Sequence, residues 1–248
     1  MKAIRTIVLI AAALLTGLNL QAETVDYKLS LTLAGVSIGA GSCSYSESDT
    51  ICDGQDAIKI QIEMKTGRAA GLFFHLCDTM TSVVTPDGTP IHYCKRIHEG
   101  NENVNEHAYF YRSGDRYAVR LTTEDATGIL TDNVRTSDIQ IMDLAAMMKF
   151  SRMIDSSNMK VGDEIDIPMV NGDLVLMQHI INEGVVSIKD AKGKRHDCLK
   201  LSVRDWKNGK ERETIKLYVT NDAAHIPVRL DIILGICFIK AALNNYSN

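Results

Sequence analysis

The sequence predicts a mainly β protein in which a curved antiparallel sheet or barrel-like meander surrounds one central α-helix. Three observations lead to this prediction. Apolar and polar residues alternate along many short stretches, which is the two-residue period of a half-buried strand. Turn signals such as Asn-Gly separate consecutive stretches, so strands that follow each other should pair antiparallel. A single segment, residues 137–155, has the composition and periodicity of a helix.

The first residues have the features of an export signal. Lys2 and Arg5 form a short positive region, and residues 7–18 form an apolar core that is too short to span a membrane. Ala22 then offers a small residue at a cleavage position. We therefore predict that residues 1–22 are a signal peptide and that the mature chain begins directly after them.

The remaining chain, residues 23–248, is long enough to form one domain with a substantial core. Its first cysteine, Cys43, lies too far from Glu23 to accept a lipid there, and no second apolar segment reaches spanning length. We expect a periplasmic protein without a transmembrane segment once the signal is cleaved. The formal net charge of −4 and the lack of a basic run argue against nucleic acid as a partner.

Strands are predicted first in the N-terminal part. Residues 25–33 (VDYKLSLTL) and 57–64 (AIKIQIEM) alternate between apolar and polar side chains. Between them, residues 35–39 match the G-x-S-x-G pattern of a hydrolase nucleophile, with Ser37 at its centre. That motif requires a strand-to-helix turn, whereas the residues after Gly39 are small and hydroxyl-rich. We therefore favour a bend between two strands.

Hairpins are predicted in the later part of the chain. Asn-Gly is the strongest short hairpin signal, because both tip residues take positive φ. The predicted turns lie at residues 113–115 (SGD), at Asn171-Gly172 and at Asn208-Gly209. The stretch from residue 225 to residue 243 (HIPVRLDIILGICFIKAAL) supplies the last predicted strands.

The predicted helix, residues 137–155, begins with a capping box formed by Ser137 and Gln140. Ala, Leu and Met predominate in it and are good helix formers. Its apolar positions extend over more than one side, so we expect it to lie inside or across the curved sheet. Its methionines are most simply core residues, and the alternative is a pliable apolar surface for a ligand. The residues predicted to line such a surface are Met142, Met147, Met148, Phe150 and Met153.

Six cysteines in an exported protein suggest disulfides. Cys43 and Cys52 would lie opposite each other if Glu47-Ser48 formed a hairpin tip. Cys77 and Cys94 flank a later turn, near each other but not in register. No pair has the C-x-x-C spacing of a redox motif or a zinc knuckle.

No motif in the sequence predicts catalysis, a metal site or a cofactor. His92, His98 and His107 do not have the spacing of a compact zinc ligand set. Pairing between strands could bring them together, but we favour surface histidines. A phosphate-binding loop and a dinucleotide fingerprint are both missing. We therefore predict no catalytic residue, no metal ligand and no cofactor.

Three stretches of the chain resemble the DUF3108 family of exported bacterial proteins, whose function is unknown. The first contains a strand, a glycine bend and a second strand. The second contains an aspartate-initiated helix that ends in arginine and is followed by a Gly-Asp turn. The third contains a small-residue turn, a cysteine and a closing isoleucine-proline strand. They are residues 27–41, residues 142–169, and residues 193–203 continuing at 217–235, and together they cover most of the predicted mature chain.

The resemblance to this family implies that Gly35 and Gly39 are bend residues. It also implies that Asp143, Arg152 and Asp163 matter beyond solvation. Residues alone favour a simpler interpretation of Asp143 and Arg152, as a pair of exposed or salt-linked helix residues. The family has no established catalytic residues, so the resemblance implies none.

Three functions stay open. The leading hypothesis is a non-enzymatic carrier or binding protein for a lipid or another apolar or amphipathic molecule, held between the curved sheet and the helix. The alternative is an envelope interaction or scaffold protein that binds a partner through exposed loops, residues 99–106 or 190–197. Its mark would be an exposed apolar patch or an unpaired strand edge. An envelope hydrolase that uses Ser37 is the third hypothesis and has the least support.

Overall fold

The described residues form one antiparallel sheet of 14 strands and a helix, α2. The predicted class, a mainly β chain with a barrel-like meander and a central helix, is confirmed. The predicted signal peptide lies outside the described residues. The computed structural model describes residues 23–33, 35–67, 77–99, 102–153, 159–207, 210–234 and 237–247.

The first eight strands form a meander in which each strand pairs with the next, so one half of the sheet follows the order of the chain. Short connections favour this arrangement, because strands that follow each other closely pair antiparallel. The strands are β1 (Glu23–Leu33), β2 (Val36–Cys52), β3 (Gln55–Thr66), β4 (Cys77–Val84), β5 (Pro90–Glu99), β6 (Glu102–Ser113), β7 (Arg116–Asp125) and β8 (Gly128–Ser137).

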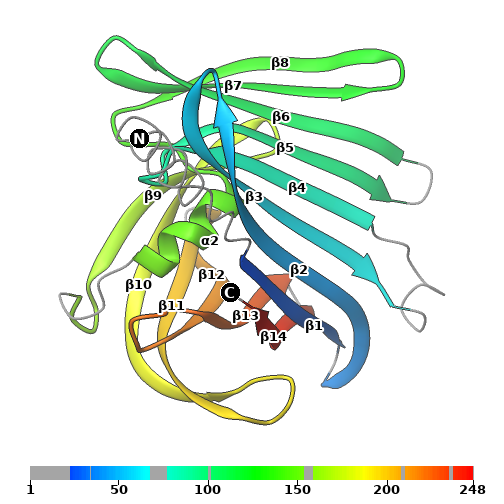
Figure 1. Cartoon of the computed structure of the whole chain (residues 1–248), viewed down its shortest axis with the longest axis vertical. Coiled ribbons are helices and arrows are strands. Elements are labelled where there is room, and N and C mark those ends of the chain that lie inside the picture. The colour runs from blue at the N-terminus through cyan, green and yellow to red at the C-terminus, as the bar shows by residue number, and fades with distance from the viewer. Residues whose placement is uncertain are drawn as a thin grey trace, which may run out of the picture.

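The last six strands form a second meander. β14 pairs with β1, so the two meanders join through the first and the last strand. β8 and β9, which come from the middle of the chain, are therefore the two edges of the sheet (Figure 1). The strands are β9 (Glu164–Asn171), β10 (Leu174–Lys189), β11 (Arg195–Lys207), β12 (Lys210–Thr220), β13 (Pro227–Leu234) and β14 (Cys237–Ser247).

The sheet curls into a nearly closed barrel, and the segment that leaves β8 runs to the opposite edge (Figure 1). The Met142 N–H donates to the Pro168 carbonyl, and the Val170 N–H donates to the Met142 carbonyl, both at 2.9 Å. These bonds make a parallel bridge between Met142 and Met169 of β9. The chain itself thus covers part of the β9 edge before it enters α2.

α2 (Leu144–Met153) is shorter than the predicted helix, residues 137–155. Ser137 is the last residue of β8, and its hydroxyl accepts a hydrogen bond from the backbone N–H two residues on, so the predicted capping box with Gln140 is wrong. The helix cannot begin earlier because Met142 is bonded to β9. Within the described ranges, no helix has the length and hydropathy needed to cross a membrane.

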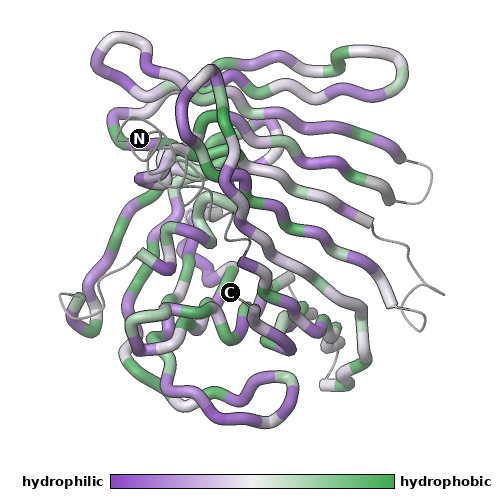
Figure 2. The backbone as a smooth tube through the Cα atoms, in the orientation of Figure 1, coloured by the Kyte–Doolittle hydropathy of each residue, from purple (hydrophilic) through white to green (hydrophobic). Residues whose placement is uncertain are grey.

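The hydrophobic core lies between the inner face of the sheet and α2. Apolar and polar residues alternate along the strands, as the colours of Figure 2 show, and every described strand except β8 contributes residues to the core cluster. α2 places Ala145 and Ala146, which are 0% and 1% exposed, against this face, and their small side chains allow a close approach. Other core residues include Val25, Ile60, Leu121, Ile180, Leu201 and Val228.

The G-x-S-x-G stretch is part of a strand pair. Gly35 has a φ of +82° and lies in the turn between β1 and β2. Ser37 is an exposed residue of β2, and the chain after it continues as strand, so the bend that we favoured over a nucleophile elbow is present at Gly35. Gly39 lies beside a shift in the register between β1 and β2 that skips Ala40, and a Cβ at Gly41 would lie 1.9 Å from the Lys65 carbonyl oxygen.

The three predicted hairpins are present. β6 and β7 join after Ser113, and β11 and β12 join at residues 208–209, which themselves lie outside the described ranges. Asn171 pairs with Leu174, so the third turn has its tip one residue later than predicted. Local turn chemistry therefore located these hairpins correctly to within one residue.

Candidate functional site

Asp143 connects the start of α2 to the sheet. Its Oδ1 accepts hydrogen bonds from the N–H groups of Ala145 and Ala146, both at 2.9 Å. Its Oδ2 accepts a hydrogen bond from the Ser82 hydroxyl of β4 at 2.8 Å. The side chain is fully buried, and burial raises its pKa to about 6. The interpretation of Asp143 as an exposed or salt-linked helix residue is therefore wrong, because it is a buried N-cap.

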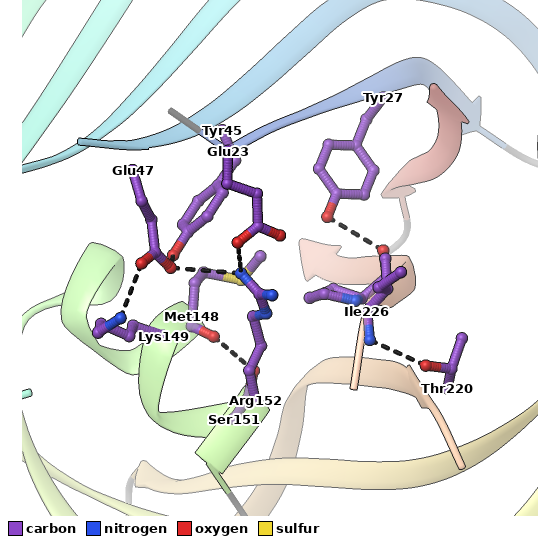
Figure 3. A network of polar contacts seen from close by, with 11 residues as sticks. Glu23, Tyr27, Tyr45, Glu47, Met148, Lys149, Ser151, Arg152, Thr220 and Ile226 are labelled. Atoms are coloured by element: carbon purple, nitrogen blue, oxygen red, sulfur yellow. Dashed lines mark hydrogen bonds and ion pairs between the residues drawn. The ribbon is translucent and has the colours of Figure 1, made fainter. Parts of the chain in front are cut away.

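Arg152 connects the last turn of α2 to the first two strands (Figure 3). Its Nη1 lies 2.8 Å from Glu23 Oε2 and 3.3 Å from Glu47 Oε1. Lys149 Nζ lies 2.7 Å from Glu47 Oε2, and the Tyr45 hydroxyl donates to the same carboxylate. The charged side chains of this group are only 12–17% exposed. Arg152 is thus salt-linked, as the residues suggested, but to the strands and not to Asp143.

Asp163 lies in the turn before β9. Its Oδ2 accepts a hydrogen bond from the Lys160 N–H at 2.7 Å, and its carbonyl accepts one from the Asn182 N–H of β10 at 3.0 Å. The residue is exposed. Asp163 therefore stabilises the turn before β9 and connects this turn to β10. A role beyond this one stays a prediction.

The residues predicted to line an apolar ligand surface are mostly packed in the core. Met142, Met147 and Met148 are 5%, 7% and 9% exposed and belong to the core cluster. Phe150 is partly buried against the same cluster, and Met153 is 54% exposed. Two depressions of the described surface, of about 490 and 530 Å³, have no lining residue from α2. A ligand-binding role for these side chains stays a prediction.

The predicted disulfide between Cys43 and Cys52 is wrong. Both residues lie on β2, which runs without a turn through Glu47 and pairs with β3 along its length. Nine residues of strand separate the two cysteines by about 30 Å, whereas a disulfide requires Cα atoms within roughly 7 Å. Both thiols are free.

The predicted link between Cys77 and Cys94 is also wrong. Cys94 is free and pairs with Thr81, four residues along β4 from Cys77. The side chain of Cys77 lies outside the described part of the chain. Burial raises the pKa of the Cys43 thiol to about 12 and that of Cys198 to about 11. These two thiols therefore stay protonated at neutral pH and are poor nucleophiles.

Pairing between β5 and β6 brings two of the three predicted histidines together. His92 Nε2 lies 3.3 Å from His107 Nδ1, and His107 Nε2 lies 3.3 Å from Glu124 Oε1 of β7. The His92 ring also stacks on Tyr109 at a centroid distance of 4.7 Å. The side chain of His98 lies outside the described residues. We call His92 and His107 the imidazole pair.

The imidazole pair lines the depression of about 490 Å³ on the outer face of β3 to β6. Burial and, after it, the charge of His107 lower the pKa of His92. The two rings direct nitrogen atoms at each other, so they are bonded mutually and not aimed at one point in the depression. A chain of hydrogen bonds from Glu124 through His107 to His92 explains their positions without a catalytic role.

The free side of β8 is the most distinctive surface of the described chain. β8 ends the sheet, and no described segment pairs with its side away from β7. Ile129, Leu130 and Val134 on this strand are 63%, 54% and 51% exposed. We call this free side, with its exposed apolar residues, the β8 edge. It has the two marks expected of an interaction protein, an unpaired strand edge and exposed apolar side chains.

Sequence reasoning did not identify β8. Its residues (GILTDNVRTS) lack regular alternation, because Ile129 and Leu130 are adjacent and Val134 is isolated among polar residues. The sequence suggested two loops as interaction sites instead, residues 99–106 and 190–197. In the structure these residues include ends of strands in the β5–β6 and β10–β11 hairpins. The usable signal was the turn at residues 126–127 directly after a strand, because strands joined by a short turn pair antiparallel.

One comparison with a solved structure agrees with the fold. A crystal structure of a β-barrel-like protein of the domain of unknown function DUF1849 from Brucella abortus is similar, with a TM-score of 0.60 at 10% sequence identity. The similarity covers 91% of this chain and 97% of that one. A DUF1329 family protein from Desulfovibrio piger matches over 95% of this chain and 89% of its own, at 11% identity and a TM-score of 0.26.

No curated protein matches this chain. The family model described as "Protein of unknown function (DUF3108)" matches residues 24–241, which is nearly the whole of the predicted mature domain. The match includes α2, Asp143, Arg152 and the β8 edge. The chain therefore belongs to the DUF3108 family.

Proposed function

We propose that this protein is a non-enzymatic interaction protein of the cell envelope that binds an extended segment of a partner protein along the β8 edge. The observation that carries the proposal is the difference between the two edges of the sheet. One edge is partly covered by the chain itself, whereas the other has no described segment beside it and carries exposed apolar side chains.

The β9 edge has the features by which proteins prevent strand addition. The backbone of Met142 occupies hydrogen-bonding groups of Pro168 and Val170. Pro168 itself lacks an N–H to donate. Glu164 and Asp166 place two carboxylates on the strand. A second chain would have to displace the first segment and bury charge to pair here.

The β8 edge has no described covering segment and no proline, and its charged residues are Asp132 and Arg135. Its sequence also contains no lysine, and it is ten residues long. Asp132 is paired with Arg120 of the neighbouring strand at 2.7 Å and so does not repel a second strand with a free charge. A row of free backbone groups complements an extended polypeptide, and exposed apolar side chains add contact area to such a strand addition.

The carrier hypothesis has less support from the described residues. Met142, Met147 and Met148 are packed in the core and offer little surface to a ligand. The hydrolase hypothesis has less still, because Ser37 is an exposed strand residue. Export to the periplasm is part of the proposal and is supported by the features of residues 1–22.

Site-specific crosslinking in living cells tests the proposal. A photoreactive amino acid is placed at position 130 or 134 on β8, and in a matched control at position 185. Val185 is 54% exposed and pairs with Leu199 of β11, so it tests an exposed valine on a strand other than β8. We expect a discrete crosslinked product from positions 130 and 134 and none from position 185. Mass spectrometry of the product should place the crosslink in an extended partner segment.

Charge substitutions provide the second arm. Val134→Lys introduces a gatekeeper residue on the edge and should abolish the crosslink from position 130. Val185→Lys should leave it unchanged. Equal products from all three positions, or no product from β8, would overturn the proposal. A crosslinked product made only of two copies of this chain would show that the β8 edge mediates self-association and does not bind a different protein.

A further inference from the structure

We propose that Glu164, Asp166 and His179 bind a divalent transition-metal ion, with Zn²⁺ as the best match to the ligand atoms. The three residues each offer one ligand atom, and these atoms lie within 4.8 Å of one another. This site is independent of the β8 edge, because it lies on the opposite edge of the sheet.

The backbone determines the convergence of these side chains. Glu164 and Asp166 are two residues apart on β9, so they point to the same face of the sheet. His179 of β10 lies directly opposite Asp166 in the antiparallel register. The turn after Asn171 holds this register. Two paired strands therefore present all three groups together without any rearrangement of the main chain.

His179 Nδ1 lies near two carboxylate oxygens, which is one more acceptor than its single N–H group needs. Its Nδ1 lies 2.8 Å from Glu164 Oε1 and 2.7 Å from Asp166 Oδ1. One N–H group makes a well-directed hydrogen bond with only one of these two carboxylates. A metal ion in place of the proton would bind both oxygens and the ring nitrogen, at about 2.0–2.2 Å from each.

The neighbouring cation is already neutralised. Arg204 of β11 lies opposite His179 in the register. Its guanidinium contacts Glu183 at 3.3 Å and Glu211 at 3.2 Å. Two carboxylates thus compensate Arg204, while the two carboxylates at His179 share a single imidazole. A divalent cation would balance their charge.

The ligand set indicates the class of metal. Carboxylate oxygens together with an imidazole nitrogen suit Zn²⁺ and Mn²⁺ better than Ca²⁺ or Mg²⁺, which prefer oxygen alone. Glu164 and Asp166 are 47% and 54% exposed, so an ion can enter from solvent. Three protein ligands leave a position open for water or for a group from another molecule.

Calorimetric titration of the mature, untagged protein with Zn²⁺ tests this inference, because a histidine tag would itself bind the ion. We expect saturable binding of one Zn²⁺ per chain. His179→Ala and Asp166→Asn should each weaken the binding at least tenfold. The visible spectrum of bound Co²⁺ should report a four- or five-coordinate site in the wild type and lose intensity in both variants.

Control variants separate this site from other histidines. His196 also contacts one carboxylate, Asp190, at 3.0 Å, but only one. His196→Ala and His92→Ala should bind Zn²⁺ as the wild type does. Circular dichroism melting without metal should show that all variants fold. No binding at 1 mM Zn²⁺, or equal affinity in His179→Ala and the wild type, would overturn the inference.

Discussion

Ser82 and Asp143 lie 61 residues apart in the sequence and meet in the core, where the serine hydroxyl donates to the aspartate Oδ2 at 2.8 Å. The other oxygen of Asp143 accepts two backbone N–H groups of α2. One carboxylate thus determines both where the helix starts and which strand it packs against. The arrangement has a cost, because a fully buried carboxylate loses its hydration.

The Asp143→Asn variant should be more stable than the wild type at neutral pH. Burial raises the pKa of Asp143 from 3.8 to about 6, so the folded state binds more protons than the unfolded state between these values. The stability that this group contributes therefore falls as pH rises through that window. Asparagine keeps an oxygen for the two N–H groups and does not ionise. The variant should gain roughly 2 kcal/mol over the wild type at pH 7.5.

Urea unfolding at several pH values measures this effect. The difference in the free energy of unfolding between Asp143→Asn and the wild type should shrink towards zero as pH falls from 7.5 to 4. Asp143→Ala removes the cap as well and should lose roughly 1–2 kcal/mol at pH 4, where the charge no longer matters. A constant difference between Asn and Asp across this range would contradict the role of burial.

Arg152→Met should destabilise the protein by roughly 3 kcal/mol, because it leaves Glu23 and Glu47 without the cation that lies between them. Arg116→Met provides the comparison. Arg116 contacts Asp138 at 2.8 Å, but both side chains are at least half exposed, so its loss should cost less than about 1 kcal/mol. Denaturant midpoints of both variants check the prediction, and similar losses would contradict it.

Gly41→Ala should destabilise the sheet by roughly 2–4 kcal/mol. Gly41 has a φ of +155°, and an added Cβ would lie 1.9 Å from the Lys65 carbonyl oxygen on β3. Gly39→Ala is the matched control, because nothing lies within 4 Å of a Cβ at that position. Thermal unfolding should show a clear loss for the first variant and little change for the second. Equal melting temperatures would show that β2 shifts to accommodate the methyl group.

Local patterns in the sequence predicted the elements but not their long-range partners. Alternation and Asn-Gly signals are short-range, so they located most strands and three hairpins. The pairing of β1 with β14, which makes β8 and β9 the edges, joins residues that are more than 200 positions apart. Nothing in the local pattern distinguishes such a neighbour from any other strand.

The errors also have physical causes. Residues 44–51 (SYSESDTI) have the polar composition of a turn. In the structure they lie in β2, where successive side chains point to opposite faces of the sheet. This error produced the false disulfide between Cys43 and Cys52. The helix start was placed at Ser137 because hydroxyl residues are good caps, but the bridge from Met142 to β9 delays it to Asp143. Tertiary contact overrode the local preference in both cases.

The imidazole pair supplies the last prediction. Burial, and then repulsion by the charge of His107, lowers the pKa of His92. Removal of the second ring in His107→Ala should therefore raise the pKa of His92 part of the way towards its usual value near 6.5. Nuclear magnetic resonance titration of the imidazole C–H signals measures the pKa of His92 directly in the wild type and in His107→Ala.

His196→Ala is the control, since His196 contacts Asp190 and not His92. Because the folded state holds fewer protons on His92 than the unfolded chain does, the stability that His92 contributes should fall as pH falls below about 6.5, opposite in direction to the contribution of Asp143, and this loss should be smaller in His107→Ala. An unchanged pKa of His92 in that variant would mean that burial alone depresses it and that the two rings are only neighbours.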